Sequence, residues 1–86
     1  MTIKKEFIKR QIGGDTILIP MGEAVYDFNG LFALNELGSF LWDLLPETDD
    51  ESQLVAAVLR EYEAEEEEVR RDVAEFLERL REMGIL

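Results

Sequence analysis

Short apolar runs separated by turn residues occupy the first 34 positions of the chain. Each run is rich in β-branched or aromatic residues, a composition typical of strands. Gly13, Gly14 and Asp15 separate the first two runs and predict a hairpin. Asn29 and Gly30 favour a two-residue turn and predict a second hairpin from the last two runs. We therefore expect four strands, at residues 7–12, 16–19, 24–28 and 31–34.

After residue 34 the apolar positions recur with a period of about 3.6, which predicts helices. Asn35 is expected to cap the first helix, because its side chain can accept a hydrogen bond from a free backbone N–H of the first turn. Pro46 is expected to end this helix. Gly38 lowers the helix propensity by roughly 1 kcal/mol relative to Ala. We therefore expect a neighbouring backbone to approach closely at Gly38.

Two more helices are predicted in the second half of the chain. Thr48 and Glu51 have the spacing of a capping box, which predicts the start of a second helix. The third helix is expected to begin near Glu65 and to end before Gly84. Its apolar stripe consists of Val69, Val73, Phe76, Leu77, Leu80 and Met83. Strands followed by three helices predict a single α+β domain over residues 1–86, with a small winged-helix-like fold.

Several residue types on which enzymes depend are missing from this chain, which has neither His nor Cys. Without His, Ser39 and Ser52 lack the usual base of a hydrolytic triad. All three Lys lie at or before residue 9, so no phosphate-binding lysine follows a glycine loop. The residue spacing of a calcium-binding loop is also missing. We therefore expect no catalytic activity, no metal site and no cofactor.

The net charge of −11 is unevenly distributed along the chain. The first 12 residues carry a net charge of +3, from Lys4, Lys5, Lys9 and Arg10 against Glu6. The remainder of the chain carries −14. A surface this negative repels phosphate backbones. We therefore expect no binding to nucleic acid.

The apolar runs are too short for a membrane protein. None approaches the roughly 18 residues that a membrane-spanning helix needs, and the N-terminal residues lack the apolar core of a signal peptide. The absence of Cys fits a reducing compartment. We therefore expect a soluble cytoplasmic protein that does not associate with membranes.

The predicted sheet has two edges, and each edge carries unpaired N–H and C=O groups. Such an edge can accept an extended peptide as an added strand. Two alternatives stay open from the residues alone. One is a winged-helix transcription factor, although residues 65–82 hold eight acids and only four Arg. The other is a structural module that forms a homodimer through an edge strand or through Trp42.

An ordered set of short motifs covers nearly the whole chain. The set is Gly22-Glu23-Ala24, Phe28-Asn29-Gly30, Leu34-Asn35-Glu36-Leu37-Gly38, Trp42, Glu61-Tyr62, Asp72-Val73 with Phe76-Leu77, and Gly84-Ile85-Leu86. In order, spacing and length it resembles the PqqD-like family, the peptide-recognition elements of ribosomal natural-product biosynthesis. The resemblance implies a non-catalytic protein that binds the leader of a precursor peptide. It also implies that the protein recruits the precursor to a modifying enzyme, often a radical S-adenosylmethionine (SAM) maturase.

The resemblance further implies that the leader lies as an extra strand beside the last strand, in a groove completed by the third helix. On that helix, the spacing favours the flank that carries Ala74, because this residue is small enough for a strand to approach. The opposite flank, with Glu68, Asp72 and Arg79, stays open, as does the charge that the leader prefers. The residues expected to contact the peptide are Leu31, Phe32, Ala33, Leu34, Arg70, Val73, Ala74, Leu77 and Arg81.

Overall fold

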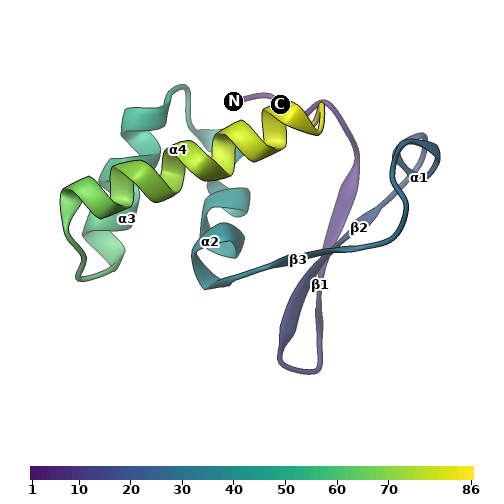
Figure 1. Cartoon of the computed structure of the whole chain (residues 1–86), viewed down its shortest axis with the longest axis horizontal. Coiled ribbons are helices and arrows are strands. Elements are labelled where there is room, and N and C mark those ends of the chain that lie inside the picture. The colour runs from purple at the N-terminus through teal and green to yellow at the C-terminus, as the bar shows by residue number, and fades with distance from the viewer.

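The computed structural model describes all 86 residues and consists of a small sheet followed by helices (Figure 1). The elements in chain order are β1 (Phe7–Ile12), β2 (Asp15–Pro20), α1 (Ala24–Asp27), β3 (Phe32–Leu34), α2 (Glu36–Leu44), the 3-10 helix η1 (Leu45–Glu47), α3 (Glu51–Glu61) and α4 (Glu66–Glu82). The predicted α+β class is confirmed. The number of strands is three rather than four.

The sheet is antiparallel, with the strand order β1-β2-β3. The predicted first hairpin is confirmed: β1 and β2 pair from Phe7 opposite Pro20 to Ile12 opposite Asp15. Gly13 turns the hairpin with a φ of +64°, a conformation that glycine adopts without steric cost. β3 pairs with β2, placing Leu34 opposite Thr16. The two edges of the sheet are therefore β1 and β3.

The predicted third strand, residues 24–28, is wrong. This segment forms the single-turn helix α1, in which the Tyr26 N–H donates to the Glu23 carbonyl and the Phe28 N–H to the Ala24 carbonyl. Its β-branched and aromatic residues favour a strand, but a strand needs a partner. The sequence predicts pairing with residues 31–34, yet the edge of β3 that faces away from β2 stays unpaired, and the segment forms helical hydrogen bonds of its own instead. Tyr26 consequently stays 90% exposed, and the predicted second hairpin does not form.

Four aromatic rings connect the sheet to the first long helix. The ring of Phe7 on β1 lies 5.3 Å from Phe28, 5.9 Å from Phe32 and 5.7 Å from Trp42 on α2, measured between ring centroids. Tilted and edge-to-face pairs of this kind stabilise a core beyond the area they bury. The cluster holds β3 against β1 and α2, and so fixes the position of the free edge of β3. Trp42 is only 8% exposed. It therefore cannot supply the dimer surface considered from the sequence.

The predicted cap of α2 is confirmed, since the Asn35 side chain accepts a hydrogen bond from the Gly38 N–H at 2.7 Å. The reason expected for Gly38 is wrong. A Cβ at this position would meet three side chains rather than a backbone: Asn35 at 3.0 Å, and Leu34 and Phe76 at 3.5 Å. The helix ends at Leu44, two residues before Pro46, and continues as η1.

α3 begins two residues later than the capping-box pattern predicts. Its N-cap is Asp50, whose side chain accepts from the Gln53 N–H at 3.0 Å. Gln53 in turn accepts from the Asp49 N–H at 2.6 Å. Thr48 is buried, and its hydroxyl donates to the Leu44 carbonyl. This hydroxyl therefore closes the end of the preceding helix rather than opening the next.

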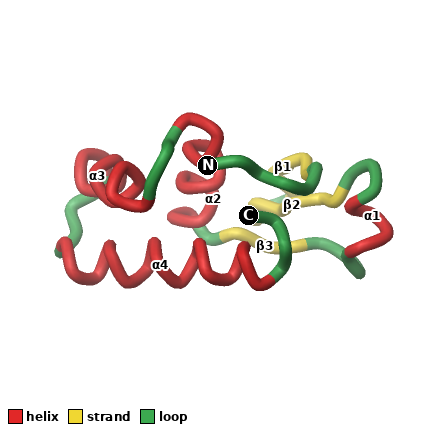
Figure 2. Tube along the Cα trace, turned by 90° about the horizontal axis from the view of Figure 1, so that it is seen from above, coloured by secondary structure: helices red, strands yellow, loops and turns green.

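α4 buries the predicted apolar stripe. Five of its residues are buried, namely Val69, Val73, Phe76, Leu77 and Leu80, and Met83 is half-buried. Beyond the helix, Gly84 adopts a φ of +76° and the Ile85 N–H donates to the Leu80 carbonyl at 2.9 Å. This is the hydrogen bond of a Schellman C-cap. Figures 1 and 2 show α3 at one end of the molecule, the sheet at the other and α2 between them, with α4 running alongside from α3 toward the sheet.

Candidate functional site

β3 presents one free edge. It pairs with β2 on one side, and no strand pairs with its other side. Successive residues of a strand direct their N–H and C=O groups to alternate sides, so an edge strand leaves about half of these groups unpaired. Phe32 and Leu34 are half-buried against the core, whereas Ala33 is exposed. The free edge of β3 can therefore receive hydrogen bonds from another chain.

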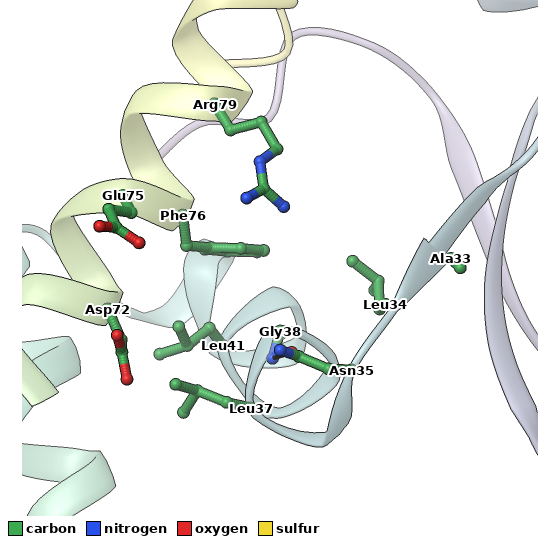
Figure 3. Close-up of a pocket in the computed structure, with 10 residues that line it drawn as sticks. All are labelled: Ala33, Leu34, Asn35, Leu37, Gly38, Leu41, Asp72, Glu75, Phe76 and Arg79. Carbon is green, nitrogen blue, oxygen red and sulfur yellow. Dashed lines mark hydrogen bonds between the residues drawn. The ribbon is translucent and has the colours of Figure 1, made fainter.

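A cavity of about 360 Å³ lies between this region and α4 (Figure 3). Its lining residues are Ala33, Leu34, Asn35, Leu37, Gly38, Leu41, Asp72, Glu75, Phe76 and Arg79. The Phe76 ring extends from α4 toward Leu34 and Gly38 and forms the apolar centre of the cavity. The charged residues of the lining all come from α4. We call this cavity, together with the free edge of β3, the groove.

The charges at the groove are not neutralised within the molecule. The three ion pairs of the structure are Lys5–Asp27, Lys9–Asp43 and Arg70–Glu66. Asp72 and Glu75 take part in none of them. Glu75 precedes Arg79 by one helical turn, yet Figure 3 shows the guanidinium directed away from Glu75 and toward β3. The groove therefore offers two unpaired carboxylates and one unpaired guanidinium around an apolar centre.

The cavity is lined by the flank of α4 opposite to the one that carries Ala74. Arg70, Ala74 and Arg81 do not line the cavity. Val73 and Leu77 are completely buried in the core and do not line the cavity either. Asp72 and Arg79, which line it, belong to the flank that the sequence leaves open. Glu75 and Phe76 were not expected in the groove, although they lie on the same flank as Asp72 at helical spacing.

The rotation of α4 about its axis explains which flank lines the cavity. Packing of α4 against α3 and the rest of the core buries both Val73 and Leu77. Phe76 then lies at the edge of the buried stripe, and the carboxylates beside it face the groove. The residues expected to contact the peptide from the strand lie at or next to β3. Phe32, Ala33 and Leu34 form β3, and Leu31 precedes it, 56% exposed.

A larger cavity, about 520 Å³, lies on the other side of Leu34, between α2 and the tip of the β1–β2 hairpin. Most of its lining is polar, and its β-sheet lining comes largely from the hairpin that β1 and β2 already pair. Burial, and then the charges of Glu36 and Glu61, raise the pKa of the Tyr62 phenol at this cavity. Because the free edge of β3 opens to α4, the groove is the better candidate for a strand-shaped ligand.

The many acidic side chains do not gather into a metal site, since no group of three or more is arranged to hold a metal ion. None of the helices combines the length and the apolar character needed to cross a membrane.

Comparison with known proteins supports the sequence resemblance. The family model described as "Coenzyme PQQ synthesis protein D (PqqD)" matches residues 17–86. A solved structure described as TbiB1 in complex with the TbiA(beta) leader peptide is similar over 100% of this chain and 94% of that chain. The sequence identity is 27% and the TM-score is 0.74. No curated protein matches the chain. The family match agrees with the prediction of a non-catalytic protein, and the chain belongs to the PqqD family.

Proposed function

We propose that this protein binds the leader of a ribosomally made precursor peptide and recruits that precursor to a modifying enzyme. An extended segment of the leader adds as a fourth strand on the free edge of β3, and α4 forms the opposite wall. The observation that carries this proposal is the unpaired edge of β3 beside a cavity with an apolar centre. The similar TbiB1 structure, which contains a leader peptide, supports it.

Strand addition divides recognition between two kinds of contact. Hydrogen bonds from the peptide main chain to β3 supply affinity with little dependence on sequence. Side chains of an extended peptide point to alternate sides, so every second one can enter the cavity. There it meets the ring of Phe76 and the side chains of Leu34 and Leu37, while Asp72, Glu75 and Arg79 surround it. The cavity therefore selects among peptides that the strand edge alone would accept.

The protein contributes binding rather than chemistry. By holding the leader at the edge of the sheet, it leaves the rest of the precursor free to enter the active site of a second protein. Family resemblance makes a radical SAM maturase the proposed partner. The gain for the modifying enzyme is a high local concentration of precursor, which requires no catalytic group on this chain.

A peptide library tests the proposal whatever the sequence of the precursor. The library displays about 20-residue segments that tile the short open reading frames of the source genome, and the full chain is the bait. Recovered peptides are then titrated by calorimetry. Hydrogen exchange of the bound protein should show protection of main-chain amides of β3, because an added strand pairs with them.

Two matched variants locate the site. Glu75→Trp fills the groove from α4, whereas Glu67→Trp makes the same change at an exposed position of α4 that lines none of the cavities described above. We expect Glu75→Trp to weaken binding at least about tenfold, equivalent to about 1.4 kcal/mol. Glu67→Trp should leave the affinity close to that of the unmodified protein. Equal affinity in both variants, or no protection of β3, would contradict the proposed site.

A further inference from the structure

We infer that the leader segment held in the groove is basic, with Lys or Arg side chains that pair with Asp72 and Glu75 of α4. This inference rests on the proposed function, because it concerns the chemistry of the peptide that the groove accepts. It starts from the distribution of charge along α4, which differs between the two flanks of the helix.

The flank of α4 that faces the groove is almost entirely acidic. Two smaller cavities adjoin the groove along α4. One, of about 240 Å³, has Asp72 in common with the groove. The other, of about 330 Å³, has Glu75 and Arg79 in common with it. The carboxylates that line these three cavities are Glu36, Glu63, Glu68, Asp72, Glu75, Glu78 and Glu82. Arg79 is the one cationic residue in the three linings. A peptide along this flank therefore meets a continuous negative surface.

Helix stability does not account for the carboxylates at the centre of this surface. Acids in the first turn, such as Glu66 and Glu67, are favourable because they face the positive end of the helix dipole. Asp72 and Glu75 lie beyond that turn, where the dipole effect has fallen away. Neither forms an ion pair within the molecule. The carboxylates beside Phe76 are thus free to pair with a ligand.

The apolar centre and charged rim of the groove suit long basic side chains. Lys and Arg bury their methylene stems against apolar surface while the charged end reaches a polar rim. A Lys or Arg over Phe76 would place its charge within reach of Asp72 or Glu75. Asp72 is half-buried at the groove, and partly buried ion pairs are screened less by salt than pairs on an open surface.

Arg79 adds a position-dependent element to this preference. It lies seven residues after Asp72, which corresponds to about 10 Å along a helix. An extended peptide covers this distance in about three residues. A basic side chain near Asp72 and Glu75 should therefore be accompanied, about three residues away, by a neutral or acidic one near Arg79. This pattern distinguishes recognition in the groove from general attraction to a negative protein.

The test uses the peptide that binds most tightly in the library selection. Variants of this peptide carry Gln, and then Glu, in place of each Lys and Arg. We expect the critical Lys→Gln or Arg→Gln change to weaken binding about three- to tenfold, the effect of one well-placed ion pair. Affinity should also fall as salt is raised from about 50 to about 300 mM.

Charge reversal on the protein then separates the groove from the overall charge. Glu75→Lys and Glu67→Lys change the net charge equally, and only the first lies in the groove. Glu75→Lys should lower the affinity of the protein for the basic peptide about fivefold or more. The same variant should regain affinity for the matching Lys→Glu or Arg→Glu peptide. Glu67→Lys should alter neither affinity by more than about twofold.

The outcomes separate this inference from the proposed function. Peptides that protect β3 yet are neutral or acidic would overturn the basic leader and leave strand addition intact. Equal effects of Glu75→Lys and Glu67→Lys would also overturn the basic leader and leave strand addition intact. They would mean that the peptide responds to the net charge of the protein and not to the groove. If recovered peptides leave β3 unprotected, or if no peptide is recovered, the proposed function fails and this inference fails with it.

Discussion

The Asn35 side chain and the Gly38 backbone share the hydrogen bond that starts α2, and a Cβ at position 38 would crowd the oxygen that accepts it. Asn35 Oδ1 accepts from the Gly38 N–H at 2.7 Å. A Cβ at Gly38 would lie only 3.0 Å from the same oxygen. Gly38 and Asn35 both line the groove, opposite Phe76. The cap therefore shapes one wall of the candidate site as well as the end of a helix.

The coupling of cap and glycine can be measured with a double-mutant cycle. Gly38→Ala should gain about 1 kcal/mol of helix propensity but displace the cap, itself worth about 1 kcal/mol. We expect the single variant to be no more stable than the natural protein. In the Asn35→Ala background the cap is already lost, so Gly38→Ala should stabilise by about 0.5–1 kcal/mol. Denaturant unfolding of the four proteins checks this. Equal effects of Gly38→Ala in both backgrounds would mean that the two residues are independent.

Leu77 should behave as a core residue, not as a groove residue. It is completely buried, so Leu77→Ala should lower the free energy of unfolding by about 2–4 kcal/mol. Arg81 is exposed, and Arg81→Ala should change the free energy of unfolding by less than about 0.5 kcal/mol. Urea unfolding gives both values. If Leu77→Ala were about as stable as Arg81→Ala, Leu77 would lie at the protein surface and not in the core.

Asp50 should make the stability of the protein sensitive to acid. The Ser52 hydroxyl and then the Gln53 N–H donate to its carboxylate and lower its pKa below 3.8 in the folded state. The folded state therefore binds fewer protons than the unfolded state at low pH. The contribution is complete above about pH 4 and is lost as the pH falls through the folded pKa. Asp50→Asn keeps a cap acceptor that does not titrate. Its unfolding midpoint should decline less steeply than that of the natural protein below pH about 4, and identical slopes would contradict this assignment.

The acidic flank of α4 should exclude duplex DNA. A transcription factor would present a basic recognition helix, whereas α4 carries carboxylates along its exposed groove flank. We expect no measurable duplex binding at about 150 mM salt, because few clustered cations are available to displace counterions from phosphates. An electrophoretic mobility-shift assay with promoter fragments is sufficient. Sequence-specific retardation at sub-micromolar protein would restore the transcription-factor alternative.

Features that depend on neighbours in the sequence could be predicted without the structure. The turn at Gly13, the cap at Asn35 and the helix end at Gly84 each involve residues only a few positions apart. The apolar stripe of α4 follows from its helical period. The ordered motifs identified the family, and the edge strand at residues 32–34 was among the predicted strands.

Features that depend on distant partners could not be predicted. Residues 24–28 have strand propensity, but they form a helical turn and leave the second edge of β3 unpaired. The spacing along α4 defined two flanks and could not choose between them. Burial of Leu77 in the core turned Asp72, Glu75 and Phe76 toward the groove. Local hydrogen bonds and helical periodicity depend on residues that are close together in the sequence. Strand pairing and helix rotation, by contrast, depend on which packing buries the most apolar surface across the whole chain.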